Sequence, residues 1–381
     1  LHGHQKTLTL GRFPELTVEN ARKQAEEAVG RIRKGEDPTG ERRADRLAIS
    51  VSELADRFIE EHIRINNKPS WQKEATRLIE KVIKPQIGKL RAKDIGTAQI
   101  AELLFKLRKE TPVQVNRVRS VLGVMFKKAE LWGIRELGSN PVRGQDRAPE
   151  VKKDRHLSDA EYIALGSALT SESQESMYVL AAIRLLLLTG CRKSELLGDV
   201  YKGIPALKWD QVDLDAGVIR IGEHKTSKKS GVRIIHLCSA ARDLLASIPQ
   251  SFGNPHVIPG EVSGQALVNY TKPWTRVKRA VAKAQAERPA GERQDIMNVT
   301  VHDLRRSFAS VGARLGYPEL FVAALLGHAA GTVTQGYARV GGNPLEEAVE
   351  TIGGRIAALL AGEVDLAAET RESRLNRKGA S

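Results

Sequence analysis

The sequence predicts a mainly α-helical protein with one small antiparallel β-sheet (an α+β fold). Apolar residues recur at helical spacing over long stretches, most clearly across residues 116–132 and 302–315. Between residues 206 and 237 the period changes to short alternating runs, which are typical of strands. Residues 138–161 are rich in Gly, Pro and charge, which predicts a linker between domains. A chain of 381 residues is long enough for two or three such domains.

The composition favours a polyanionic partner. Lys and Arg number 60 against 46 Asp and Glu, so the formal net charge is +14. An excess of this size favours DNA binding, and ordinary solubility charge is the alternative. Cys191 and Cys238 form neither a disulfide framework nor a zinc-binding spacing, which fits a reducing cytoplasm. No apolar run reaches the ~18 residues that a membrane span needs, and because the chain starts at Leu1, a missing signal peptide carries little weight.

The first half of the chain predicts a strand followed by helices. Residues 1–11 alternate in a strand-like pattern, and an amphipathic helix is expected over 20–32 with Thr17 as its N-cap. Further helices are expected from about residue 50, over 71–82 with an end at Lys84-Pro85, and from Thr97. The helix over 116–132 has a basic face, for which solvent exposure and contact with phosphates are both open. Its members are Arg117, Arg119, Lys127 and Lys128.

The second half holds an arginine at the start of a helix. Residues 179–188 form a buried apolar run that Thr189-Gly190 ends, and Arg192 then opens the next helix with Glu195 three residues later. Three short strands are expected within 206–214, 217–222 and 232–237. Helices are expected at Ser158, where Glu161 completes a capping box, over 265–286, and over 344–361. The last helix is free to pack on its own domain or on a neighbouring protomer.

A second basic group is expected at the start of the helix that Thr300 caps. His302 and Arg305 are three residues apart, so they are neighbours on a face different from the apolar stripe of Leu304, Phe308, Val311 and Leu315. We therefore expect both side chains to leave the buried side of the helix together. The next helix ends at Gly327-His328, and Tyr337 follows nine residues later.

Arginine and histidine donors that converge on one point suit a phosphate, and a nearby tyrosine hydroxyl is a possible covalent nucleophile. Taken singly, a His-x-x-Arg pair is more often a solvated helix face, and a single tyrosine is usually packing. The combination with Arg192 favours the chemical interpretation. A glycine loop of the Walker type and an acidic cluster for two metals are both missing from the sequence, which disfavours a metal-dependent nuclease.

Four segments, in this order and spacing, resemble the tyrosine recombinases, the phage-type and genomic-island integrases: TGCRKSELL, HDLRRSFAS, LLGH and GYARV. The resemblance covers nearly the whole chain and implies four parts. Residues 1–48 correspond to the C-terminal part of an arm-type DNA-binding domain with a linker, and residues 49–148 to a helical core-DNA-binding domain. Residues 149–364 correspond to the catalytic domain, and 365–381 to a disordered tail.

The resemblance also implies the functional residues. The catalytic set consists of Arg192, Lys225, His302, Arg305, His328 and Tyr337, with Tyr337 as the nucleophile that forms a 3′-phosphotyrosyl link. Lys225 lies on the expected hairpin between the last two strands, where Lys228 and Lys229 remain alternatives. The basic helix that contains Arg276 and Arg279 is expected near DNA. The segment GDVYKGIPA departs from the family pattern as an insertion, and we assign it no role.

The implied activity is site-specific integration or excision of a mobile element without metal, ATP or other cofactor. The implied partners are double-stranded DNA attachment sites, a homotetramer in the synapse, and accessory DNA-bending or excision-directing proteins, with no membrane. The expected location is the cytoplasm, at the nucleoid when DNA is bound. Two alternatives are a relaxing topoisomerase with the same chemistry and a DNA-binding protein whose active site has decayed.

Overall fold

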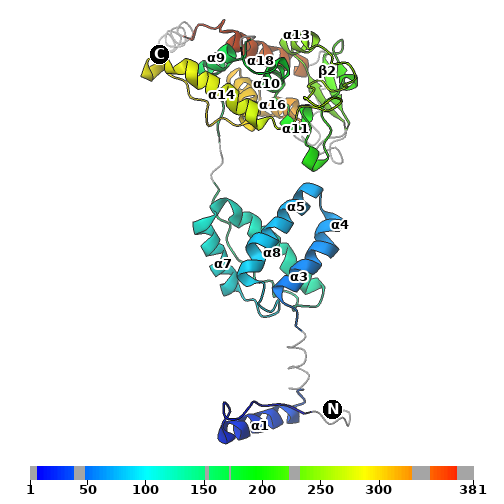
Figure 1. The fold of residues 1–381 in the computed structure, drawn as a ribbon, viewed down its shortest axis with the longest axis vertical. Helices are drawn as coiled ribbons and strands as arrows, with labels where there is room; N and C mark the ends of the chain where they lie inside the picture. Colours follow the sequence, from blue (N-terminus) through cyan, green and yellow to red (C-terminus); the bar gives the residue numbers. More distant parts are fainter. Residues whose placement is uncertain are drawn as a thin grey trace. The chain divides into compact units, whose positions relative to one another are not determined.

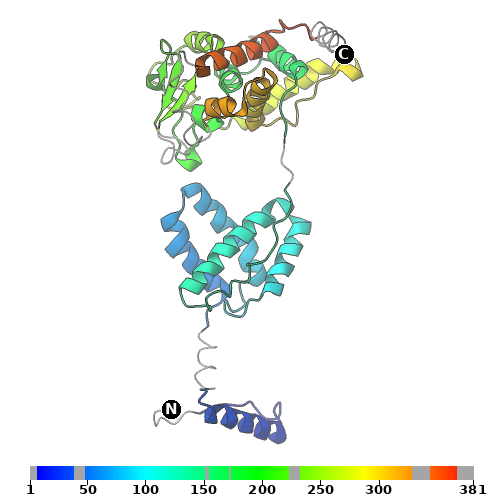
Figure 2. The same ribbon diagram turned by 180° about the vertical axis from the view of Figure 1, so that it is seen from behind.

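The computed structural model describes residues 7–37, 48–150, 154–170, 173–222, 232–327 and 344–366. The chain divides into two compact units, Leu1–Val151 and Lys152–Ser381. Figure 1 and the reverse view in Figure 2 show the first unit as helical and the second as helices with a small sheet. The fold prediction of mainly α structure with one small antiparallel sheet is therefore confirmed.

The N-terminal helix α1 (Val18–Arg33) begins as expected, because the Thr17 hydroxyl accepts a hydrogen bond from the Asn20 N–H at 3.3 Å. The strand expected before it is wrong for residues 7–11, which have no regular secondary structure. A strand needs a neighbour for its backbone hydrogen bonds. Within the described part of the chain, the strands of the one named sheet all lie beyond residue 211.

The helical unit has a capped start and a continuous apolar core. Ser50 and Glu53 form a capping box at the start of its first helix, which confirms a helical region from about residue 50. Leu54, Leu122 and Phe126 are fully buried in its core. Its elements are α3 (Val51–Phe58), η1 (Ile59–Ile63), α4 (Arg64–Asn66), α5 (Pro69–Leu78), η2 (Ile79–Ile83), α6 (Lys84–Ile87), α7 (Thr97–Glu110) and α8 (Pro112–Leu131).

The helix expected to end at Lys84-Pro85 continues through the proline to Ile87. The turn before it, η2, is a π-helix, in which the Lys84 N–H bonds to the carbonyl of Ile79, five residues earlier. Pro85 consequently falls in the first turn of α6, where a missing N–H costs little. The widened turn therefore explains why the proline does not end the helix.

Part of the expected linker 138–161 belongs to the helical unit. The Asn116 side chain on α8 donates to the Ala148 carbonyl and accepts from the Ala148 N–H, both at 2.8 Å. The Asn140 N–H likewise donates to the Glu130 carboxylate at 2.6 Å. Residues 140–148 are thus held on α8 by buried polar pairs rather than forming a free tether. The expected capping box of Ser158 and Glu161 is confirmed at the start of the second unit.

The second unit combines helices with a three-stranded antiparallel sheet in the order β1-β2-β3. Ile219 pairs with Ile235 across the two longer strands. Its elements are α9 (Asp159–Ala168), α10 (Met177–Thr189), α11 (Lys193–Leu196), η3 (Val200–Lys202), η4 (Trp209–Gln211), β1 (Val212–Asp213), β2 (Val218–Ile221), β3 (Arg233–His236), α13 (Ser239–Ser247), α14 (Thr271–Ala286), η5 (Ala290–Glu292), α15 (Val301–Arg314), α16 (Glu319–Leu326) and α18 (Pro344–Ala361).

Two helix expectations in this unit change. The helix expected from residue 265 begins only at Thr271, because Ala266 pairs with Pro259 in an isolated bridge and Asn269 has a positive φ of 57°. The helix expected over 344–361 is confirmed, and it packs on α9, α10, α13 and α15 of its own unit. No described helix has the length and apolar character that a membrane crossing requires.

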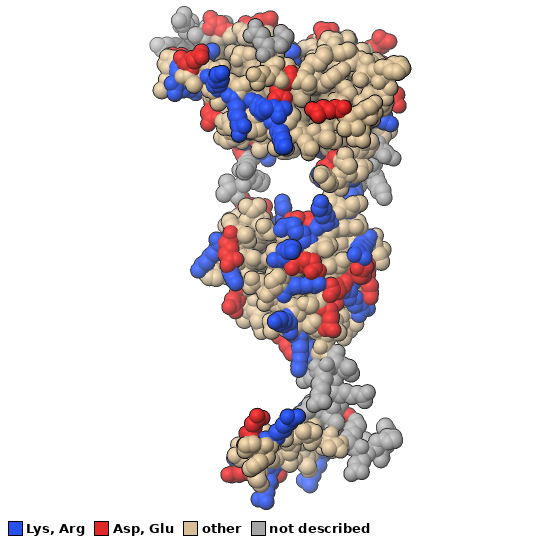
Figure 3. All heavy atoms as spheres, viewed as in Figure 1, with Lys and Arg blue, Asp and Glu red and all other residues tan. Residues whose placement is uncertain are grey.

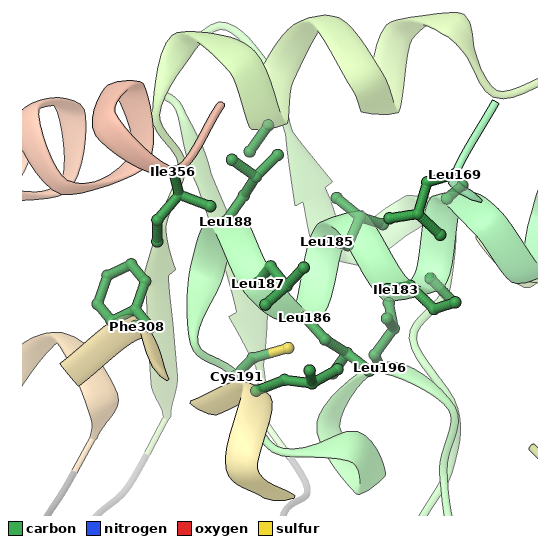
Figure 4. Packing of buried hydrophobic residues seen from close by; sticks show 14 of the residues in the cluster. Leu169, Ile183, Leu185, Leu186, Leu187, Leu188, Cys191, Leu196, Phe308 and Ile356 are labelled. Carbon is green, nitrogen blue, oxygen red and sulfur yellow. The ribbon is translucent and has the colours of Figure 1, made fainter. Parts of the chain in front are cut away.

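Helix α10 lies at the centre of the second core. Residues Val179–Thr189 are all buried except Arg184, as expected for the apolar run. Figure 4 shows Phe308 of α15 and Ile356 of α18 beside Leu187 and Leu188 of α10. Helices α15 and α18, which are distant from α10 in the sequence, therefore both pack against this apolar helix.

Gly166 sets the distance between α9 and α18. A Cβ added at Gly166 would lie 1.9 Å from the backbone oxygen of Leu360, so Gly166→Ala has to push the two helices apart. We expect a loss of about 1–3 kcal/mol in the free energy of unfolding, the range for an overpacked core. Gly354→Ala on α18 is the matched control, because nothing lies within 4 Å of its added Cβ. Chemical denaturation of the full chain measures both, and equal stability of the two variants would contradict the prediction.

Candidate active site

The first turn of α15 is fixed from its own sequence. The Asp303 carboxylate accepts hydrogen bonds from the Thr300 N–H at 2.8 Å and the Thr300 hydroxyl at 2.7 Å, which completes a capping box. Asp303 also pairs with Arg306 at 2.7 Å. The expected cap at Thr300 is confirmed, and it places His302 on the exposed side of the first helical turn.

Helix α14 holds the chain just before this turn. The Trp274 indole N–H donates to the Val299 carbonyl at 3.0 Å. The Lys278 ammonium donates to the carbonyls of Met297 at 2.7 Å and Val299 at 3.2 Å. Two side chains of one helix thereby fix the approach to α15. This role could not be predicted from the sequence, because the spacing of Trp274 and Lys278 is that of ordinary members of a basic amphipathic helix.

Arg305 corrects the expectation that it leaves the buried side of α15 together with His302. The Arg305 side chain is buried, with 4% of its surface exposed, whereas His302 is exposed. Its guanidinium donates to the Gly190 carbonyl at 2.8 Å and to the Leu326 carbonyl at 2.6 Å. These carbonyls end α10 and α16, whose C-terminal dipoles favour a cation. The Arg305 guanidinium can be buried because the carbonyls at two helix ends replace the water that would otherwise bond to it.

Arg192 lies in the short turn between α10 and α11. Gly190 takes a left-handed conformation with φ 60°, which ends α10 and turns the chain. Arg192 is the N-cap of α11, as expected, and Glu195 closes back on it. The Glu195 carboxylate accepts from the Arg192 N–H at 2.7 Å and from its guanidinium at 2.6 Å. Glu195 is buried, so it orients Arg192 instead of being solvated at the surface.

A third arginine, Arg233, was not expected in this region. It lies on β3 and is buried, with 7% of its surface exposed. Its guanidinium donates to the carbonyls of Ile234 and Leu325, both at 2.6 Å. A signal was present in the sequence. Arg233 alternates with Ile235, so a charged residue occupies an inward position of the strand.

The charges of this cluster act on one another. Burial, and then the positive charge of Arg192, lower the pKa of Arg305 to about 10, so the group stays a cation at neutral pH. Loss of solvent, followed by the nearby charges of Arg306 and Arg305, lowers the pKa of His302. A neutral imidazole at physiological pH can accept a proton. Burial raises the pKa of the neighbouring Cys191 to about 11, which keeps it a protonated thiol.

The structure brings together Arg192 and Arg305, and it places His302 within reach of their electrostatic influence. The other three residues of the expected set, Lys225, His328 and Tyr337, lie outside the described residues. The alternatives Lys228 and Lys229 lie in the same undescribed range. Among the residues that the structure does describe, no three His, Cys, Asp or Glu side chains form a group that could hold a metal ion.

The basic face expected on α8 is only partly exposed. Arg117 is exposed and pairs with Glu74 at 3.3 Å. Arg119 is half-buried and donates to the Gln145 carbonyl at 2.8 Å, so one of its donors supports the segment packed on α8. Lys127 is exposed and Lys128 is half-buried. Contact of these four residues with DNA stays a prediction.

The basic character of α14 is visible on the surface. Figure 3 shows Lys and Arg side chains gathered along this helix. Arg276 and Arg279 are both exposed, and Arg276 donates to the Glu175 carboxylate, with one contact at 2.8 Å. The Arg276 side chain is exposed, whereas the Glu175 side chain is largely buried, so the two partners of this ion pair differ in exposure. The DNA contact expected for Arg276 and Arg279 stays a prediction.

Two family models match the chain. Residues 155–342 match the model described as the phage integrase family, and residues 2–45 match the model described as an arm DNA-binding domain. The prophage integrase IntZ of Escherichia coli strain K12 is 25% identical over 268 residues, which cover 68% of this chain and 63% of that protein. The integrase of Shigella phage Sf6 is 22% identical over 249 residues, 65% of this chain and 62% of that protein. The chain spans less than two thirds of the length of these relatives.

Solved integrases share the fold. A lambda integrase tetramer bound to a Holliday junction superposes with a TM-score of 0.59 at 21% identity, over 86% of this chain and 91% of that one. A lambda integrase dimer bound to a COC′ core site gives a TM-score of 0.57 at 21% identity, over 74% of this chain and 97% of that one.

The depressed pKa of His302 can be measured directly. Arg306→Gln removes a nearby positive charge and leaves the Asp303 carboxylate without its ion-pair partner, and both changes favour imidazolium. We therefore expect the pKa of His302 to rise towards the ordinary value of about 6.5. NMR titration of the imidazole signals, assigned with His302→Gln, measures the shift.

Arg314→Gln is the matched control on the same helix, because Arg314 pairs with Asp159 instead. This control should leave the His302 pKa unchanged. An equal rise in both variants would show that the shift does not come from the Arg306 charge.

Proposed function

The chain belongs to the phage integrase family, the tyrosine recombinases, and from this premise we propose that it is a site-specific DNA recombinase. It cuts and rejoins DNA strands through a covalent 3′-phosphotyrosyl intermediate, and so integrates or excises a mobile element. The substrate is double-stranded DNA that carries attachment sites. The reaction takes place in the cytoplasm, where the chain binds the nucleoid.

One observation carries this proposal. The groups that bond to the guanidiniums of Arg192 and Arg305 occupy only some of their N–H donors. Arg305 bonds to two neutral carbonyls, and Arg192 to the single carboxylate of Glu195. A guanidinium has five N–H groups. Both side chains therefore keep donors for the non-bridging oxygens of a phosphodiester, and among the described residues no carboxylate forms an ion pair with Arg305.

The proposed reaction begins at Tyr337. Its phenolic oxygen attacks the scissile phosphorus and forms a tyrosine O–P bond, the phosphorus stays bonded to the 3′-oxygen, and the bond from phosphorus to the 5′-oxygen breaks. His302 accepts the phenolic proton, because its lowered pKa keeps the imidazole neutral. Lys225 gives a proton to the departing 5′-oxygen, and His328 donates a hydrogen bond to the phosphate.

The arginines supply the electrostatic part of catalysis. The transition state carries more negative charge on the phosphate oxygens than the ground state does, and donors fixed in advance stabilise it selectively. Because Arg305 is fixed by two helix ends and Arg192 by Glu195, neither has to reorganise during the reaction. The phosphotyrosyl bond conserves the energy of the phosphodiester, so a second 5′-hydroxyl can reverse the step without ATP.

The assembly that we propose is a homotetramer that holds two DNA duplexes in a synapse. The solved lambda integrase tetramer on a Holliday junction is the model for this arrangement. Recombination exchanges strands between two duplexes, and each duplex is cut on both strands, so four nucleophiles are needed. Accessory DNA-bending or excision-directing proteins complete the proposed set of partners.

Tyr337→Phe tests the nucleophile. The variant lacks the attacking oxygen but keeps the ring, so we expect normal DNA affinity and complete loss of the covalent adduct. The substrate is a nicked duplex that spans the joined ends of the mobile element, and the adduct is detected as a protein band that retains labelled DNA after denaturation. A remaining adduct on Tyr337→Phe would mean that another residue is the nucleophile.

The same substrate, supplied as two intact sites, separates the proposal from its rivals. A recombinase yields recombinant junctions from paired sites, whereas a relaxing topoisomerase reseals the original strand. A DNA-binding protein with a decayed site gives no adduct with the unmodified chain. Resealing of the original strand without recombinant junctions would refute the proposed function, and so would the absence of an adduct with the unmodified chain.

The acid limb of the cleavage rate tests His302 as the proton acceptor. Because its pKa is lowered, the neutral imidazole persists below the ordinary value of about 6.5. We expect the single-turnover cleavage rate to stay level down to that pH and to fall at lower pH. His302→Gln should be slower and should lose this limb. An acid limb above pH 6.5, or one unchanged in His302→Gln, would assign the titrating group elsewhere.

A further inference from the structure

The last turn of α16 is held by two buried arginines from different elements. The Leu326 carbonyl accepts from Arg305 of α15, and the preceding carbonyl, that of Leu325, accepts from Arg233 of β3, both at 2.6 Å. The C-terminal end of a helix carries partial negative charge, so cations are favourable there. Two successive carbonyls that each bind a guanidinium fix both the position and the direction of this helix end.

Arg233 also contacts the residue at which α16 ends. Gly327 is the C-cap of α16 and has a left-handed φ of 66°. A Cβ added at Gly327 would lie 2.5 Å from both Cζ and Nε of Arg233. The turn therefore lies directly against the guanidinium, and the pair Arg233 and Gly327 forms one packed unit at the end of the helix.

The charge of Arg233 is not neutralised by an ion pair within the described part of the chain. Arg233 is buried, and no carboxylate pairs with it among the described residues. Its Nε has no hydrogen-bond partner in the part of the chain that the structure describes. An apolar side chain of similar volume would avoid the cost of removing a charge from water, but it would leave the Leu325 carbonyl without this donor. Both the charge and the donors of Arg233 therefore matter at this place.

The role of this charge follows from the neighbours of Arg233. Its positive charge lowers the pKa of Arg305 after burial and the charge of Arg192, so the three guanidinium groups share one electrostatic environment. Glu195, which is also buried, bonds to Arg192. Three cations and one carboxylate leave an excess of positive charge, which an anion such as a DNA phosphate relieves.

We propose that Arg233 is a further positioning residue for DNA strand cleavage, which fixes the end of α16 against Arg305 and strengthens the positive field at the phosphate. The inference rests on the proposed function. His328 immediately follows Gly327 in the sequence. The turn at Gly327, which Arg233 contacts, is therefore the point from which the segment that carries His328 begins. Arg233 acts through Arg305 and this turn, and it does not itself contact the reacting atoms.

Arg233→Met and Arg233→Lys test the proposal in the full chain. Methionine fills the space without charge, and lysine keeps the charge but reaches fewer acceptors. With the nicked junction duplex, we expect Arg233→Met to lower the single-turnover cleavage rate at saturating DNA by about 10- to 100-fold, the range for groups that orient a directly acting one. The DNA Kd should change by no more than about threefold, which corresponds to about 0.7 kcal/mol. Arg233→Lys should recover part of the rate.

Arg220→Met is the matched control. Arg220 lies on the adjacent strand β2, is exposed and pairs with Asp213, so the same chemical change there should leave the cleavage rate unchanged. The unmodified chain and Tyr337→Phe run in parallel. An adduct with the first and none with the second establishes the activity independently of Arg233. A missing adduct with the unmodified chain refutes the proposed function instead.

A split between rate and affinity distinguishes positioning from mere stability. A folded Arg233→Met that cleaves as fast as the unmodified chain overturns the proposal, as does an equal loss in Arg220→Met. If thermal melting shows that Arg233→Met does not fold, the decision passes to Arg233→Lys. A slow, folded lysine variant with unchanged DNA affinity supports the proposal. A lysine variant that is fully active or also unfolded assigns Arg233 a purely structural role.

Discussion

The arrangement of the second unit depends on one buried cation that is bonded to the ends of two helices. Arg305 of α15 donates to the carbonyl at the end of α10 and to the carbonyl at the end of α16. Both helices end at a glycine with positive φ, Gly190 and Gly327, which directs the carbonyls towards the same point. Removing Arg305 would leave two helix ends without a partner inside a core, and removing the helix ends would leave a buried charge unsolvated.

This way of stabilising an arginine preserves its charge. A carboxylate partner would neutralise the guanidinium, whereas carbonyl groups replace the hydration of the cation and add no formal negative charge. The described cluster contains Arg192, Arg233, Arg305 and a single buried carboxylate, Glu195. The fold thus supports a concentrated positive charge before any anion binds. The cost appears as the lowered pKa of Arg305, and it is tolerable because the value of about 10 is still well above neutral.

The sequence predicted local features well because they depend on near neighbours. The capping boxes at Ser158 and Thr300 and the break at Gly190 each arise within a few residues. Arg192 was found for the same reason, since Glu195 is only three residues away. The fold class followed from periodicity, because helices and strands distribute apolar residues differently.

The features that were missed depend on contacts between distant segments. The burial of Arg305 requires carbonyls 115 and 21 residues away. A helical wheel places Arg305 off the apolar stripe of α15. It carries no information about the ends of α10 and α16, which cover Arg305 in the fold. Leu315 shows the converse, since it continues the stripe and is nevertheless 41% exposed at the end of the helix. Arg233 bonds to a carbonyl 92 residues away, so only its inward position on a strand pointed to a partner.

The same helix that carries Arg305 also anchors both neighbours of the segment with Tyr337. Helix α16, which precedes this segment, and α18, which follows it, both pack on α15. The three helices are tightly packed at Gly312, where an added Cβ would lie 2.9 Å from Val322 of α16 and 3.0 Å from Ile352 of α18. A substitution at this contact would therefore displace both attachment points together with the helix of His302 and Arg305. The cations that we propose to bind the phosphate and the flanks of the segment that carries the proposed nucleophile thus pack on the same helix, as an attack that depends on alignment would require.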